Sequence, residues 1–170
     1  MTECTMKPLR HQKRSSRRLA GYDYSSPAFY FITIGTRKMA HYFGHIDQHG
    51  MNFNKLGIIA YDRFQKIPYY FERVKIHSFV IMPNHIHGLI EIIERQPGKI
   101  DQRKHEMGVI IANYKASVTR WANKSGYEYF RWKHRYYDSI LRKYDAYERV
   151  TYYIKNNIAA WQRKYMPLVA

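Results

Sequence analysis

Two kinds of apolar periodicity alternate along the chain, and the first is typical of β-strands. Residues 28–36, 74–82 and 85–93 are rich in aromatic and β-branched side chains and are predicted to form strands. The last two of these stretches are separated by Pro83 and Asn84, residue types that favour a turn. We therefore expect them to pair in an antiparallel hairpin.

The second periodicity, with apolar residues three and four apart, predicts three helices. The first follows Asn54, a suitable N-cap, after a connection that contains glycine. The apolar stripes of the first two helices are Leu56, Ile59, Ala60, Phe64 and Ile67, and Met107, Ile111, Tyr114, Val118, Trp121 and Ala122. A short strand at 137–141 and a helix over 145–165 complete the order β-α-β-β-α-β-α. This order predicts an α+β fold of ferredoxin-like or split β-α-β type, with an antiparallel-rich sheet and helices on one face.

The 170 residues are expected to form a single domain, residues 21–170, preceded by a basic arm, residues 1–20. Between positions 7 and 18 the arm carries basic residues and no acidic ones: Lys7, Arg10, Lys13, Arg14, Arg17 and Arg18. Such a segment binds backbone phosphate or serves as a disordered, solubilising tail, and the sequence does not separate these two interpretations.

The charge of the chain favours a nucleic-acid partner. Lysine and arginine number 29 against 13 acidic residues, a formal net charge of +16. A solvated basic surface and a membrane-surface protein are the alternatives, but no cationic amphipathic helix stands out. The 17 tyrosines are suited to stacking on bases, and equally to a core.

The sequence lacks the features of membrane, secreted and disulfide-bonded proteins. No apolar run approaches the roughly 20 residues of a membrane span, and the basic N-terminus has no apolar signal region. The single cysteine, Cys4, builds neither a disulfide framework nor a cysteine metal site. These observations favour a reducing interior, so we expect a cytoplasmic protein.

Two histidines in one predicted strand are the first candidate chemistry. His85 and His87 lie two residues apart and therefore share a face, with Ile86 on the other. Two imidazoles on a rigid strand are a natural pair of metal ligands. The alternative is two partly exposed histidines that hydrogen-bond to neighbours or contact phosphate.

The last helix offers a further ligand. Tyr153 and Asn157 are four residues apart at the edge of its apolar stripe, whereas Tyr152 and Asn156 point to solvent. An asparagine oxygen is a suitable ligand for Mg²⁺ or Mn²⁺. An amphipathic helix with an ordinary boundary tyrosine remains the alternative.

Several stretches resemble a known family. "FVIMPNHIHGLIEI", "NYKASVTRWAN" and "RYYDSILRKYDAYERVTYYIKNNIAAW" are similar to the single-tyrosine HUH transposases. The chain resembles most the REP-associated tyrosine transposases, which act on repetitive extragenic palindromes. The resemblance runs from about Arg17 to Trp161, and its most specific parts are "PNHIH" and "YIKNN…W".

The resemblance implies an HUH-endonuclease fold and a role for each matched position. His85 and His87 would be metal ligands, Tyr153 the nucleophile and Asn157 the third ligand. The chain departs from the family at Ile158, where a proline is usual. We therefore expect the helix to run on to Trp161 rather than break.

The implied activity is transposition by cleavage and rejoining of single-stranded DNA at hairpins. With Mg²⁺ or Mn²⁺ as cofactor, the tyrosine would form a 5′-phosphotyrosine link and release a 3′-OH. No nucleotide cofactor is needed, in agreement with the lack of a P-loop pattern. DNA-binding candidates are Lys13, Arg14, Arg17, Arg18, Arg131, Trp132, Lys133 and Arg135. The sequence leaves open a monomer or a homodimer, and a tyrosine acting in its own chain or in a partner's.

Two other functions compete with this one. The first is a hairpin-binding module on the same scaffold without catalysis, although such a module has no need of all four site residues. The second is a metal-dependent hydrolase that uses only the two histidines. Tyr114, Tyr136 and Tyr137 are the rival tyrosines, and none has a ligand-type residue four positions away on the same face.

Overall fold

The computed structural model describes residues 22–94 and 106–166. Four strands form its main sheet: β1 (Ala28–Gly35), β4 (Val74–Ile81), β5 (His85–Ile92) and β6 (Tyr137–Leu141). Their order is β4-β5-β1-β6, and every pair is antiparallel. This is the ferredoxin-like arrangement, so the predicted fold class is confirmed. The predicted arm, with Lys13, Arg14, Arg17 and Arg18, lies outside the described residues and stays a prediction.

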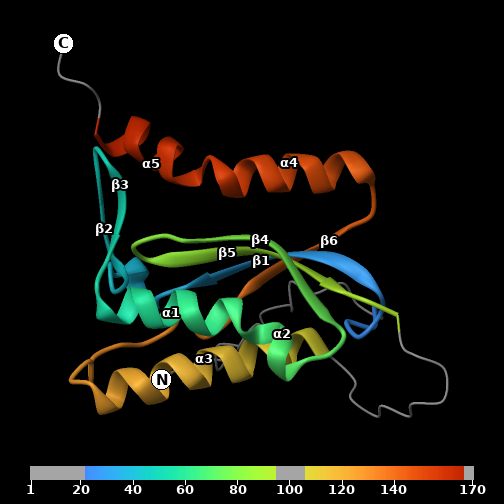
Figure 1. Ribbon diagram of the computed structural model, residues 1–170, viewed down its shortest axis with the longest axis horizontal. Helices are drawn as coiled ribbons and strands as arrows, with labels where there is room; N and C mark the ends of the chain where they lie inside the picture. Colours follow the sequence, from blue (N-terminus) through green and yellow to red (C-terminus); the bar gives the residue numbers. More distant parts are fainter. Residues whose placement is uncertain (1–21, 95–105, 167–170) are drawn as a thin grey trace, which may run out of the picture.

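Helices cover both faces of this sheet, as Figure 1 shows. One face carries α1 (Lys55–Gln65), α2 (Ile67–Tyr70) and α3 (Glu106–Lys124), and the other carries α4 (Tyr144–Lys155) and α5 (Asn157–Tyr165). The prediction of helices on one face is therefore corrected. The reason lies in β1, which is apolar on both sides: Tyr30 and Ile32 are fully buried in the main core, while Phe31 packs on Tyr153 of α4.

Helix α1 packs closely against strand β5. Helix α1 begins where predicted, because the Asn54 side chain accepts a hydrogen bond of 2.9 Å from the Gly57 amide. Phe64 of α1 then lies directly against Gly88. A Cβ atom at Gly88 would stand 2.5 Å from the Phe64 ring, so only glycine permits this close approach of helix and strand.

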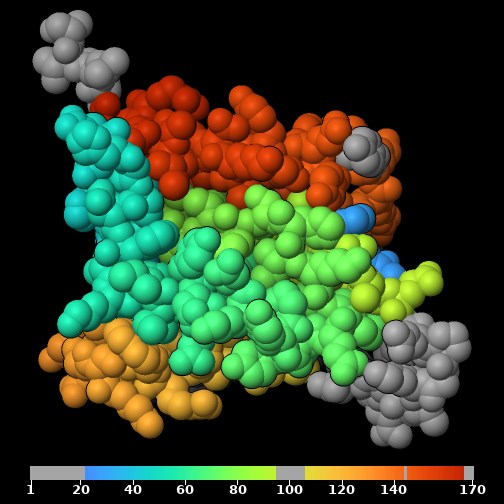
Figure 2. All heavy atoms as spheres, viewed as in Figure 1, coloured from blue at the N-terminus to red at the C-terminus, as the bar shows by residue number. Residues whose placement is uncertain are grey.

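A hairpin not predicted from the sequence fills the connection after β1. The 3-10 turn η1 (Arg37–Met39) leads to β2 (Gly44–Asp47) and β3 (Gly50–Phe53), which pair antiparallel. In Figure 2 this hairpin, in cyan, runs along one edge of the molecule beside α5. The Gln162 side chain donates a 2.6 Å hydrogen bond to the Asp47 carbonyl and ties α5 to the hairpin.

The last helix is interrupted at Asn156, which corrects the expectation of a continuous helix. The backbone ψ of Asn156 is 5° instead of the usual helical value, and its side-chain amide bonds to the Tyr152 carbonyl. The i to i−4 hydrogen bonds persist on both sides, from Asn156 to Tyr152 and from Ala160 to Asn156. The helix therefore changes its local geometry for one residue and continues as α5. Among the described residues, no helix is long and apolar enough to cross a membrane.

Candidate functional site

The two histidines open strand β5, directly after the Pro83–Asn84 turn. His85 and His87 project toward the α4 side of the sheet, and their ring centroids are 4.6 Å apart. Strand β5 is hydrogen-bonded to β1 on one side and to β4 on the other, so the backbone beneath the pair is held at both edges. The two imidazoles therefore form one rigid unit on the sheet.

Burial keeps both rings neutral. Loss of hydration lowers the pKa of His85 to about 4. Burial also lowers the pKa of His87 to about 3, and the nearby His85 adds to this effect. At neutral pH each imidazole is therefore uncharged and has one nitrogen lone pair, which is the form that binds a metal ion.

Tyr153 of α4 reaches the histidine pair. Its hydroxyl oxygen lies 3.2 Å from Nε2 of His87, and its ring packs edge-on against Phe31. The residue is 48% exposed, so Tyr153 lies at the surface of the molecule. Tyr152, the preceding residue, is 70% exposed and points away from the sheet. The tyrosine and the histidine belong to the same chain, so a monomer brings these two groups together.

Asn157 lies on the same helical face as Tyr153. It is the first residue of α5 and is buried, with 7% exposure. Tyr153, one turn before it, contacts His87, and Trp161, one turn after it, packs against His85 with 6.4 Å between ring centroids. Because residues four apart share a helix face, Asn157 is flanked on both sides by contacts to the two histidines.

The donor set of this site suits a divalent cation. Within residues 22–94 and 106–166, no group of three or more His, Cys, Asp or Glu side chains is placed to hold a metal ion. The third side-chain ligand that the resemblance implies is the amide oxygen of Asn157, beside the two imidazoles. Two neutral nitrogens and one amide oxygen fit Mn²⁺ well and Mg²⁺ acceptably, and they leave coordination positions for phosphate and water.

One curated relative covers nearly the whole chain. An uncharacterized protein of Haemophilus influenzae is 39% identical over 166 residues, which span 90% of this chain and 92% of the relative. The chain belongs to the family of that protein. No protein-family model matches it. Membership in this family implies that the two proteins share a fold, but it does not show which activity the chain has.

A solved structure identifies the fold of this family. A REP-associated tyrosine transposase bound to a REP hairpin matches the chain with a TM-score of 0.59 and 16% sequence identity. The match covers 86% of this chain and 74% of the transposase. At this identity the likeness shows the fold and not the activity. The family therefore has the transposase fold that the resemblance implied.

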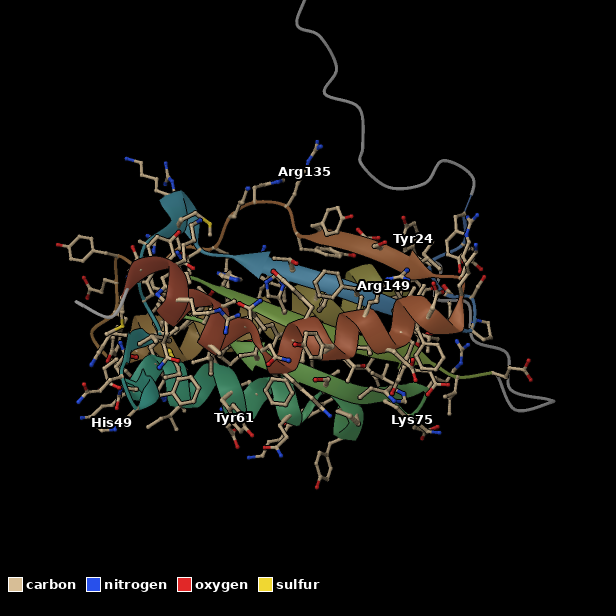
Figure 3. The ribbon with its side chains drawn as sticks, turned by 90° about the horizontal axis from the view of Figure 1, so that it is seen from above. Tyr24, His49, Tyr61, Lys75, Arg135 and Arg149 are labelled. Carbon is tan, nitrogen blue, oxygen red and sulfur yellow. The ribbon has the colours of Figure 1, made fainter. Side chains whose placement is uncertain are left out.

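The predicted DNA-binding residues of the central segment divide into two groups. Arg131, Lys133 and Arg135 are exposed, and Figure 3 shows Arg135 projecting away from the sheet. Trp132 is half-buried and packs against Phe130 of the core, and its indole N–H donates a 3.1 Å hydrogen bond to the Lys115 carbonyl. The tryptophan therefore has a packing role, and its contact with DNA stays a prediction.

The rival tyrosines are placed differently from Tyr153. Tyr114 is buried, and its hydroxyl donates a 3.0 Å hydrogen bond to the Ala60 carbonyl. Tyr136 is half-buried against the core. Tyr137 is 47% exposed and faces the same side of the sheet as His87, because it pairs with Thr33 and Thr33 pairs with His87. Its backbone lies two strands away from that of His87, at roughly 10 Å, and it belongs to β6 instead of α4.

Sequence reasoning missed two residues that contact the histidines. Thr33 of β1 lies opposite His87, with 2.9 Å between its hydroxyl and Nδ1 of the ring. Asn84 places its side-chain oxygen 2.6 Å from Nδ1 of His85. The sequence predicts a turn at Asn84, and the signal for its second role is its position next to a histidine. Thr33 carries no local signal, because its contact depends on the register of two strands far apart in sequence.

Proposed function

We propose that the protein is a metal-dependent enzyme that cleaves and rejoins single-stranded DNA, a transposase of the REP-associated tyrosine type. The observation that carries this proposal is the Tyr153 hydroxyl 3.2 Å from His87, with His85 beside it and Asn157 one turn away. These are the four positions that the family resemblance assigns to its catalytic centre. An isolated tyrosine–histidine contact would carry much less weight.

The residues have separate tasks in the proposed reaction. His85, His87 and Asn157 would hold Mg²⁺ or Mn²⁺, which when bound supplies Lewis-acid polarisation of the scissile phosphate. The Tyr153 oxygen forms a bond to phosphorus as the bond from phosphorus to the 3′ oxygen breaks. The products are a 5′-phosphotyrosine link and a free 3′-OH. The tyrosine proton passes to water and the leaving 3′ oxygen takes a proton from water, since Tyr153 is half exposed to solvent.

The proposed substrate is single-stranded DNA beside a hairpin. The net charge of +16 favours a polyanion, and Arg131, Lys133 and Arg135 are exposed on the chain that leads into β6. The transposase of the same fold is bound to a REP hairpin. The contact between Tyr153 and His87 lies within one chain, so we propose a centre that is complete in the monomer and does not need a dimer.

The test is a covalent adduct between protein and DNA. Wild type, Tyr153→Phe and the matched control Tyr152→Phe are incubated with a pool of labelled hairpin DNAs, with Mn²⁺ or with a chelator, and separated on a denaturing gel. We expect a metal-dependent adduct in wild type and in Tyr152→Phe, and none in Tyr153→Phe. Tight hairpin binding without an adduct in any sample would replace the proposal by the binding module. Cleavage that persists in Tyr153→Phe would replace it by a hydrolase.

A further inference from the structure

Both histidines of the candidate site have the same ring nitrogen in contact with a neighbouring oxygen. Nδ1 of His85 lies 2.6 Å from the side-chain oxygen of Asn84, and Nδ1 of His87 lies 2.9 Å from the hydroxyl of Thr33. A neutral imidazole carries its proton on one nitrogen and its lone pair on the other. The partners at Nδ1 therefore decide what Nε2 offers to a ligand.

The Asn84 side chain is locked in one orientation. Its NH₂ group donates to the Met39 carbonyl at 3.2 Å, and its main-chain carbonyl accepts from the Thr36 amide at 2.9 Å, which holds the backbone beneath the side chain. The residue is 6% exposed. A flipped amide would place two acceptor oxygens against each other at Met39. The oxygen of Asn84 therefore faces His85, and because it only accepts, Nδ1 of His85 must carry the proton.

The His87 ring has an equivalent arrangement through β1. Its Nδ1 lies between β5 and β1, where Thr33 stands directly opposite in register. Its Nε2 is on the side of α4, where the Tyr153 hydroxyl lies 3.2 Å away. Hydroxyl groups both donate and accept, so these contacts are compatible with the tautomer in which the Thr33 hydroxyl accepts a hydrogen bond from Nδ1 and the Tyr153 hydroxyl donates one to Nε2. In that tautomer both contacts are satisfied, and His87 carries its proton on the same nitrogen as His85.

We propose that Asn84 and Thr33 are positioning residues that hold the Nδ1 protons of His85 and His87, so that both Nε2 lone pairs remain for a ligand. The assignment of a metal ion as that ligand rests on the proposed function. The tautomers themselves belong to the metal-free protein. Partners of this kind fix the ring orientation and raise the basicity of the ligating nitrogen, and their loss typically weakens metal binding about 10-fold to 100-fold.

The first measurement is the long-range ¹H–¹⁵N spectrum of the metal-free protein at neutral pH, which separates protonated from unprotonated ring nitrogens. The chain has nine histidines, so the His85 and His87 signals are assigned with the variants His85→Gln and His87→Gln. We expect a protonated Nδ1 and an unprotonated Nε2 for both residues. A proton on Nε2 of His85 in wild type would overturn the role of Asn84.

The second measurement compares variants by calorimetric titration with Mn²⁺ alone. Thr33→Val keeps the shape of the side chain and removes the hydroxyl, whereas Thr33→Ser keeps the hydroxyl. We expect Mn²⁺ to bind about tenfold more weakly to Thr33→Val and to Asn84→Ala, and normally to Thr33→Ser. The spectrum of Asn84→Ala should show His85 redistributed between both tautomers.

The outcomes separate this inference from the proposed function. Unchanged tautomers and unchanged Mn²⁺ affinity in Thr33→Val and Asn84→Ala would overturn the inference. Should Asn84→Ala not fold, which a thermal melt reports, the wild-type spectrum and the two Thr33 variants still decide it. If the predicted tautomers are observed but no hairpin gives an adduct, the proposed enzymatic function is rejected. The positioning role of Asn84 and Thr33 is then retained.

Discussion

Helix α4 makes two contacts between a tyrosine and a histidine, and only one of them has the surroundings of a site. Tyr153 lies 3.2 Å from His87, and Tyr147, six residues earlier, has its hydroxyl 3.1 Å from Nδ1 of His77. Each histidine also packs on a phenylalanine of β1, with centroid distances of 5.3 Å for Phe31 and His87 and 5.1 Å for Phe29 and His77. The two clusters are thus nearly repeated along one helix and one strand.

The difference lies in the second hydrogen-bond partner of each histidine and in the position of its strand in the sheet. His77 is on the edge strand β4, and its second nitrogen, Nε2, is 2.8 Å from the Glu91 carboxylate. The second nitrogen of His87, Nδ1, is 2.9 Å from the uncharged Thr33 hydroxyl. His87 is on an interior strand, and its ring neighbour is a second histidine instead of an acid. Under the proposed function, the histidine with the carboxylate partner has a structural role, whereas the histidine beside a second neutral imidazole belongs to the ligand pair.

The largest expected difference between the clusters is in catalysis. Tyr153→Phe should reduce adduct formation at least about 10³-fold, because the nucleophilic oxygen is gone. Tyr147→Phe should leave the adduct within about threefold of wild type and cost about 1 kcal/mol of unfolding free energy through the lost hydrogen bond. Gel quantification and urea denaturation measure the two effects. Equal loss of adduct in both variants would end the distinction between the clusters.

A second difference should appear in the pH dependence of stability. The folded pKa values of His85 and His87, about 4 and about 3, lie below the unfolded value of about 6.5. Between these pH values the two histidines are protonated in the unfolded chain and not in the folded chain. The free energy of unfolding is therefore highest above pH 6.5 and falls as the pH decreases. We expect a loss of about 2 kcal/mol per histidine between about pH 7 and pH 5.

Urea denaturation of the metal-free protein at the two pH values measures this loss. The double variant His85→Gln, His87→Gln should lose distinctly less stability over the same interval, because the two buried titrating groups are absent. The single variant His77→Gln is the matched control from the second cluster. An equal loss in wild type and in the double variant would contradict the lowered pKa values.

A third difference concerns metal affinity in the absence of DNA. The Tyr153 hydroxyl lies against the Nε2 lone pair of His87 that a metal would use, so the two compete. Tyr153→Phe should therefore bind Mn²⁺ about threefold to tenfold more tightly than wild type, the equivalent of one lost neutral hydrogen bond. Tyr147→Phe should bind it unchanged. Calorimetric titration measures both, and weaker binding by Tyr153→Phe would indicate that the tyrosine itself is a ligand.

The smallest expected effect is at the acid of the second cluster. Glu91→Gln removes the charge opposite His77, where both side chains are about one-quarter exposed. Such a partly exposed pair contributes less than about 1 kcal/mol to stability, and we expect no change in adduct formation. A thermal melt and the gel assay suffice for this variant. A large loss of adduct would show that the second cluster takes part in binding DNA.

Several features were predictable because they depend on neighbours in sequence. The shared face of His85 and His87 follows from the alternation of a strand, and the shared face of Tyr153 and Asn157 follows from the helical repeat. The Asn54 cap and the bounds of β6 were predicted for the same reason. Local periodicity therefore sufficed for the strand and helix types and for each half of the candidate site taken separately.

Only the tertiary structure decided how these halves meet. The register of β1 against β5 places Thr33 at His87, and the packing of α4 on the second face of the sheet places Tyr153 there. The same long-range packing places the half-buried Trp132 against Phe130 of the core and sets the β2–β3 hairpin against α5. The sequence by itself determined which residues are able to bind a metal or attack a phosphate, since that depends on residue type and period. Which tyrosine meets which histidine depends on contacts across many residues, and no local pattern encodes them.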